Sequence, residues 1–125
     1  MILCDTDVIA EMLKGRNPVF SSLQLLGLAA LRISSVTKAE LIYGALNKLD
    51  LAFILKGIAA LGVYQVEPAI SELALSLMQQ YVLSNRLALP DALIAATALH
   101  HHLPLYTLNR KDFRYLTGLQ LHEPA

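Results

Sequence analysis

The feature that most restricts the fold of this chain is a regular alternation of short apolar runs with longer helical stretches. Residues 2–4, 31–34, 63–66 and 103–107 are expected to form strands, because each run is short, apolar and bounded by turn or capping residues. Helical stretches between such strands imply crossover connections, which join parallel strands. The sequence therefore predicts one α/β domain over residues 1–125, with a mostly parallel central sheet.

Helices are expected where apolar residues recur at helical spacing or where capping residues mark a start. The expected helices cover residues 8–15, 18–30, 36–48, 51–61, 70–83, 90–100 and 110–116, and a last strand is expected at 119–121. The stretch 90–100 is apolar almost all round, so this helix is expected to be buried. Asn85 is expected at the turn before it, since asparagine tolerates a left-handed backbone.

Composition limits the class of protein. Hydrophobic residues make up 55% of the chain, enough for a real core, and no apolar run approaches the ~20 residues that span a bilayer. Ten basic and ten acidic residues balance, so overall charge gives no support for a nucleic-acid partner. Cys4 is the single cysteine and lies in an apolar run, where it is expected to be a small buried hydrophobe. A cytoplasmic setting is therefore expected.

Acidic residues recur near the ends of the predicted strands. Asp5 follows the first strand, Glu40 lies one turn into the helix after the second, Asp91 opens the buried helix, and Asp112 follows the fourth strand. Alone, each has an ordinary explanation as a helix cap or a helix-dipole partner. Asp7 is expected to cap a helix or to support the site. Sites in parallel sheets form beyond the carboxyl ends of the strands, so these acids are expected to lie together.

Grouped carboxylates repel one another unless cations neutralise them. Ligands that are all oxygen select hard ions such as Mg²⁺ or Mn²⁺. Such ions can activate a water and stabilise the leaving oxygen of a phosphodiester. This chemistry predicts a nuclease, with either Asp112 or Asn109 completing the site. Gly44 follows Glu40 by four residues inside the expected helix, which indicates close packing behind Glu40.

Four segments carry a resemblance to a known family. ILCDTDVIAEMLKG, ISSVTKAELIYGA, LPDALIAATAL and LYTLNRKDF resemble, in order and spacing, the motifs of PIN domains, and in particular the VapC-type toxins of toxin–antitoxin pairs. The resemblance covers essentially the whole chain. It implies a three-layer α/β/α sandwich, Mg²⁺- or Mn²⁺-dependent endoribonuclease activity on RNA, homodimerisation, and inhibition by a cognate antitoxin protein.

The resemblance also assigns residues. It places Asp5, Glu40, Asp91 and Asp112 at the catalytic, metal-binding positions, and Thr6, Thr107 and Asn109 at supporting polar positions. Two turns depart from the family pattern. Members often have glycine before the third motif, where this chain has Asn85, and in the turn before the fourth strand, where it has residues 100–103, HHHL.

Basic side chains near the expected site have two explanations. Arg110, Lys111 and Arg114 surround Asp112 and are either a solvated helix face or phosphate contacts. The run from His100 to His102 is expected to be a solvated helix end, because consecutive helical residues point about 100° apart and do not converge on one ion.

Two alternatives to the nuclease remain. One is a PIN-fold interaction module with weak or no catalysis that binds a partner protein or RNA. The other is a receiver-like or phosphatase domain, which would need a lysine after the fourth strand and would leave Glu40 and Asp91 unused. The apolar helices at 18–30 and 51–61 exceed what the core needs. Part of their surface is expected to be buried in a dimer or under an antitoxin helix.

Overall fold

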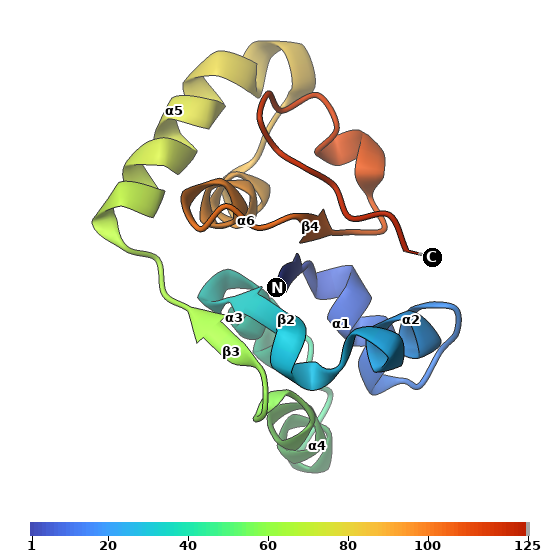
Figure 1. Cartoon of the computed structure of the whole chain (residues 1–125). Helices are drawn as coiled ribbons and strands as arrows, with labels where there is room; N and C mark the ends of the chain where they lie inside the picture. Colours follow the sequence, from blue (N-terminus) through green and yellow to red (C-terminus); the bar gives the residue numbers. More distant parts are fainter. Residues whose placement is uncertain (125) are drawn as a thin grey trace.

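A single parallel sheet organises the structure, a computed structural model that describes residues 1–124 (Figure 1). Its four strands are β1 (Ile2–Cys4), β2 (Leu31–Ser34), β3 (Gly62–Tyr64) and β4 (Leu105–Tyr106), in the spatial order β3-β2-β1-β4. Leu3 in β1 pairs with Arg32 on one side and with Leu105 on the other. All pairings between these strands are parallel, which confirms the predicted sheet.

Six α-helices and two 3₁₀ helices connect these strands. The α-helices are α1 (Thr6–Leu13), α2 (Val19–Leu26), α3 (Ser35–Tyr43), α4 (Lys48–Ile58), α5 (Pro68–Asn85) and α6 (Leu89–His100). The 3₁₀ helices are η1 (Leu28–Ala30) and η2 (Arg110–Asp112). The predicted buried helix is confirmed, because most residues of α6 after its first turn are inaccessible to solvent.

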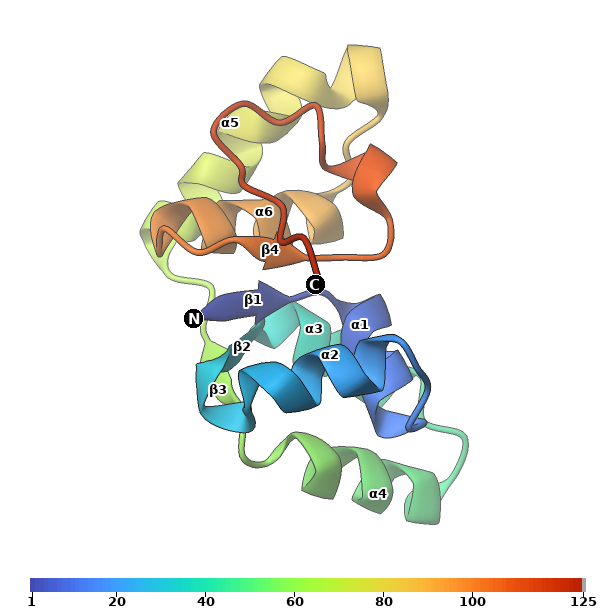
Figure 2. The same cartoon turned by 45° about the vertical axis from the view of Figure 1, so that its right-hand side comes forward.

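The sheet separates two hydrophobic cores. Ile2 and Cys4 of β1 face the core formed with α1, α2 and α4, whereas Leu3 between them faces the core formed with α5 and α6. This alternation is what a strand covered on both faces requires. Figures 1 and 2 show α5 and α6 on one side of the sheet and α1, α2 and α4 on the other. The expected three-layer arrangement is confirmed.

Capping residues at the strand ends start two of the helices. Asp5 directly follows β1 and accepts the Thr6 N–H at 2.8 Å, and Ser34 is the last residue of β2 and accepts the Val36 N–H at 3.1 Å. Such caps satisfy N–H groups that have no partner inside the helix. Because both caps are the residues at which strands end, the N-termini of α1 and α3 lie at the carboxyl edge of the sheet.

Several sequence predictions about elements were wrong. The helix expected at 18–30 is divided into α2 and η1 at Gly27, and the helix expected at 110–116 is only the three-residue η2. The helix expected at 36–48 ends at Tyr43; Gly44 follows it, and Asn47 caps the new helix α4 by accepting the Asp50 N–H at 2.8 Å. Gly44 is therefore not a mid-helix glycine, and a Cβ there would make ordinary contacts. The strand expected at 119–121 is a single bridge between Leu121 and Leu105, because β4 is only two residues long.

Cys4 is fully buried, as predicted. Burial and the neighbouring Asp5 raise the pKa of its thiol to about 12, so the reactive thiolate is scarcely populated at neutral pH. Within residues 1–124, no helix has the length and apolar character needed to cross a bilayer.

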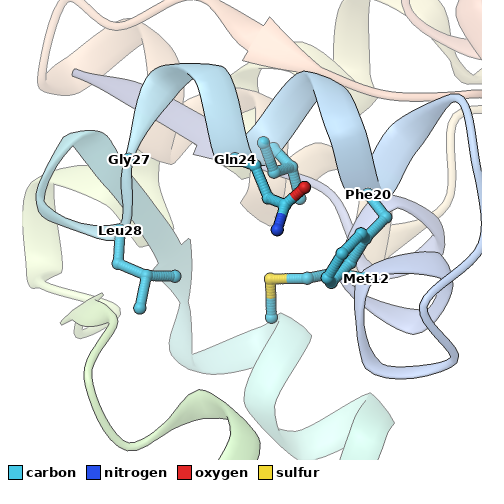
Figure 3. A pocket seen from close by; sticks show the side chains of 6 residues that line it. Met12, Phe20, Gln24, Gly27 and Leu28 are labelled. Atoms are coloured by element: carbon cyan, nitrogen blue, oxygen red, sulfur yellow. The ribbon is translucent and has the colours of Figure 1, made fainter.

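The helices α2 and α4 carry large apolar side chains that the core does not use. Leu25 of α2 and Leu49 of α4 are each 84% exposed, and Phe53 of α4 is 56% exposed. A hollow of about 410 Å³ opens beside α2, where side chains from α1, α2 and the chain that follows α2 meet (Figure 3). Its lining residues are Met12, Phe20, Leu23, Gln24, Gly27 and Leu28. The excess apolar surface expected from the sequence is therefore present.

Candidate active site

Asp5 is the best-fixed carboxylate at the carboxyl edge of the sheet. Its Oδ1 accepts the Thr6 N–H at 2.8 Å, and its Oδ2 accepts the Thr107 hydroxyl, which follows β4, at 2.7 Å. Asp5 is 6% exposed, and burial is the main cause that raises its pKa. Each carboxylate oxygen accepts one bond here and retains a further lone pair, so Asp5 can still bind a ligand.

Thr6 links Asp5 to Glu40. The Thr6 hydroxyl donates to Glu40 Oε1 at 2.7 Å and lies 3.1 Å from the hydroxyl of Thr37, which can donate to it. Glu40 is exposed, while Thr37 is fully buried. Thr37 was not predicted from the sequence, although it precedes Glu40 by three residues and so lies on the same face of α3.

Asp91 and Asp112 come from distant segments and meet at a small cleft. Asp91 lies in the first turn of α6, Asp112 ends η2, and both line a cleft of about 150 Å³ together with Tyr115. Burial raises the pKa of Asp91 to about 6, and repulsion by Asp5, Asp112 and Glu40 adds to the shift. The four acids expected from the sequence are thus close enough to act on one another.

Asp7 is a further acid at this edge, and it is half-buried. Its Oδ2 accepts the Leu108 N–H at 3.1 Å, whereas its Oδ1 is buried and has no hydrogen-bond partner among the described residues. Burial and the nearby Asp5 raise its pKa to about 6. Asp5, not Asp7, caps α1, so Asp7 supports the turn that follows β4.

Asn109 contributes through its backbone. Its N–H donates to the Thr107 hydroxyl oxygen at 3.1 Å, and this hydroxyl in turn donates to Asp5. The Asn109 residue is exposed. Asp112, by contrast, shares the cleft with Asp91 and raises the pKa of both Asp5 and Asp91.

The donor set fits a hydrated divalent cation. Within residues 1–124, no three histidine, cysteine, aspartate or glutamate side chains are placed to hold a metal ion by themselves. Mg²⁺ normally keeps several waters and uses one or two carboxylates, and it does not require such a cage. Burial and, to a smaller extent, mutual repulsion raise the pKa of Asp5, Asp7 and Asp91, and a cation at this edge would relieve the repulsion. Asp7 Oδ1 has no hydrogen-bond partner within residues 1–124 and is free to face such a cation.

The basic residues after β4 differ in what they contact. Arg110 donates to the His122 carbonyl oxygen at 3.2 Å and forms an ion pair with Glu123. It therefore holds the C-terminal segment, whereas Lys111 and Arg114 are exposed.

The histidine run is not wholly a solvated helix end, as the sequence had indicated. His101 stacks on Tyr64 of β3, with 3.7 Å between ring centroids, and its Nε2 is buried. His100 and His102 are exposed, so the prediction holds for these two residues.

The chain matches a known protein family and is similar to several solved structures. The family model described as PIN domain matches residues 2–119. A toxin–antitoxin complex from Klebsiella pneumoniae contains a similar chain (28% identity, TM-score 0.82), and the match covers 100% of both chains. No curated protein matches the chain.

Two further solved structures have the same fold. FitAcB from Neisseria gonorrhoeae is 25% identical over 99% of this chain and 98% of that chain, with a TM-score of 0.81. VapBC-1 from nontypeable Haemophilus influenzae is 25% identical over 98% of both chains, with a TM-score of 0.79. The structural neighbours are toxins of toxin–antitoxin complexes.

Proposed function

The chain belongs to the PIN-domain family, and from that premise we propose that it is an Mg²⁺- or Mn²⁺-dependent endoribonuclease, the toxin of a toxin–antitoxin pair in the cytoplasm. One observation carries the proposal. Acids from four separate segments of the chain, Asp5, Glu40, Asp91 and Asp112, meet at the carboxyl edge of the sheet. Thr6 donates hydrogen bonds to both Asp5 and Glu40, and Asp91 and Asp112 line one cleft, so their charges repel one another. Gathering like charges is unfavourable for folding alone. A metal-dependent phosphodiesterase, however, needs such carboxylates to bind its cation.

In this proposal Asp5, Glu40, Asp91 and Asp112 form the catalytic, metal-binding set. One or two of these carboxylates contact a hydrated ion directly, and the others act through its waters. The chemistry that a divalent ion supplies at such a site is activation of a water and neutralisation of charge on the leaving oxygen. Thr6 and Thr107 hold Asp5 and Glu40 in place through short hydrogen bonds, which keeps their oxygens pointed at the same space. Asn109 supports Thr107 through its N–H.

We also propose a cognate antitoxin and a second copy of this chain as protein partners. The exposed apolar side chains of α2 and α4, among them Leu25, Leu49 and Phe53, support this proposal. Apolar patches of this kind mark protein contacts more often than free surface. The similar chain from Klebsiella pneumoniae is part of a toxin–antitoxin complex, which supports an antitoxin as one occupant.

Cleavage of a structured RNA pool by the purified protein tests the enzymatic proposal. We expect cutting with Mg²⁺ and with Mn²⁺ and none with EDTA. Asp5→Asn should abolish cutting while leaving the fold intact, because the amide oxygen can still accept the Thr6 N–H. Glu72→Gln is the matched control, since Glu72 is an exposed acid of α5. This control should cut RNA at the wild-type rate.

Two results would contradict the proposal. Cutting that continues in EDTA, or in folded Asp5→Asn, would show that the carboxylates are not the active site. No cutting by folded protein with either metal would favour the interaction module, which binds a partner protein or RNA without catalysis.

A further inference from the structure

Arg86 occupies a backbone conformation that favours glycine. It follows the last turn of α5 with φ 54° and ψ 39°, the left-handed region, and its N–H donates to the Val82 carbonyl oxygen at 2.9 Å. A residue with a Cβ is strained there, whereas glycine is not. An outlier of this kind is a reason to ask what the side chain does.

Arg86 lines the cleft that holds Asp91 and Asp112. Asn85 and Tyr115 contribute to the same cleft, which measures about 150 Å³. Among residues 1–124, the Arg86 guanidinium makes no ion pair and no hydrogen bond, unlike Arg110 and Arg16, which pair with Glu123 and Glu11. A cationic residue therefore lines the same cleft as Asp91 and Asp112, and its charge has no acidic partner within residues 1–124.

We propose that Arg86 is a substrate-binding residue, which contacts an RNA phosphate adjacent to the bond that is cut. The inference rests on the proposed ribonuclease function and deepens it. Guanidinium groups bind phosphate through paired N–H donors, a geometry that other side chains do not offer. The cleft of about 150 Å³ has room for about five waters at ~30 Å³ each. It is therefore large enough to admit a phosphate group.

The net charge of the cleft determines when Arg86 can contact a phosphate. Asp91 and Asp112 outnumber Arg86 in the cleft, so the cleft repels a phosphate unless a divalent cation is bound. The cation and the guanidinium should therefore both strengthen the binding of RNA. This dependence separates a phosphate contact from a purely structural role, because a turn residue would not change how affinity depends on salt.

A second left-handed residue provides a matched control. His102 follows α6 at the end opposite Asp91, with φ 56°, and lies outside the cleft. Arg86→Gly and His102→Gly relieve the same backbone strain, so both should keep or raise the Tm. Only Arg86→Gly should weaken RNA binding. Arg86→Lys should retain part of the affinity, and Arg16→Ala should retain all of it, because Arg16 lies beyond the far end of α1.

The measurement is fluorescence anisotropy with a labelled single-stranded RNA and Ca²⁺ in place of Mg²⁺, over a series of salt concentrations. We expect Arg86→Gly to weaken binding about tenfold and to reduce the slope of log affinity against log salt by ~0.7, the value for one phosphate contact on a single strand. In cleavage assays with Mg²⁺, its KM should rise more than its kcat falls.

The outcomes separate this inference from the function on which it rests. If the wild type cuts RNA and Arg86→Gly binds RNA with unchanged affinity and slope, Arg86 is only a turn residue and the inference fails alone. If the wild type binds RNA without cutting it, a weaker Arg86→Gly supports the contact while the enzymatic proposal fails. If the wild type neither binds nor cuts RNA with either ion, both are wrong.

Discussion

The Thr107 hydroxyl donates to Asp5 Oδ2 at 2.7 Å and thereby joins the ends of β4 and β1, which lie 102 residues apart in sequence. The bond is buried, and the same hydroxyl accepts the Asn109 N–H. One threonine thus fixes both the acid at the centre of the sheet edge and the turn that leads to Asp112.

Thr107→Val should therefore reduce activity without unfolding the protein. Loss of a buried hydrogen bond costs about 1 kcal/mol, to which the unsatisfied Asp5 oxygen and Asn109 N–H add. The hydrogen bond lowers the pKa of Asp5, so its loss raises that pKa and moves the acidic limb of the pH–rate profile to higher pH. We expect kcat to fall on the order of tenfold. Thr107→Ser retains the hydroxyl and should behave like the wild type; equal losses in both variants would exclude the hydrogen bond as the cause.

Asp91→Asn should stabilise the metal-free protein at neutral pH. Burial and neighbouring acids raise the pKa of Asp91 from 3.8 to about 6, so the folded state binds this proton more tightly than the unfolded state. Ionised Asp91 therefore destabilises the folded state. This destabilisation is complete above pH 6 and disappears as pH falls towards 4. The full shift corresponds to about 3 kcal/mol, which solvent screening at this half-buried group reduces to on the order of 1 kcal/mol.

Urea unfolding in EDTA at pH 7.5 and at pH 4 measures this effect. The variant should be more stable at pH 7.5, and the two proteins should converge at pH 4. Mg²⁺ should then raise the Tm of the wild type more than that of the variant, because binding to the folded state stabilises it. A variant that is less stable at pH 7.5 would show that Asp91 is not under electrostatic strain.

The sequence predicted the sheet and its acids because both follow from local pattern. Short apolar runs bounded by turns located β1, β2 and β3, and the position of Asp5 directly after β1 placed it at the sheet edge. Parallel connectivity then brought the other acids to the same edge.

Helix ends and contacts between distant residues were harder to predict from the sequence. Helix α3 ends before Gly44, and Asn47 caps the next helix, although Gly44 was interpreted from the sequence as a glycine within one longer helix. Asn85 was expected to take the left-handed backbone on propensity, whereas the geometry after α5 gives it to Arg86. Thr37 has no sequence signal beyond its spacing from Glu40, because its contact with Thr6 crosses between helices.

Arg110→Met should impair activity more than stability. Arg110 begins η2, which ends at Asp112, and it contacts the carbonyl oxygen of His122 and the carboxylate of Glu123. Exposed ion pairs contribute at most about 1 kcal/mol, so the loss of stability should be small. The loosened C-terminal segment should nevertheless displace Asp112 and lower kcat several-fold. Lys111→Met removes a neighbouring exposed charge and serves as the control; if both variants lower kcat equally, charge near the RNA and not the position of Asp112 is responsible.

The apolar face of α4 yields a prediction about assembly. Light scattering of the purified protein should give a mass near twice the 13.7 kDa of one chain. Leu49→Glu combined with Phe53→Glu should lower it to that of a monomer, because burying two new carboxylates in an apolar contact costs several kcal/mol. Both side chains are exposed in the single chain, so the Tm of the monomer should change little. Leu83→Glu on α5, at a residue 90% exposed, is the matched control and should leave the mass unchanged. A monomeric wild type would exclude the dimer and leave an antitoxin as the partner for this face, which the same double variant would test by loss of the complex on co-expression.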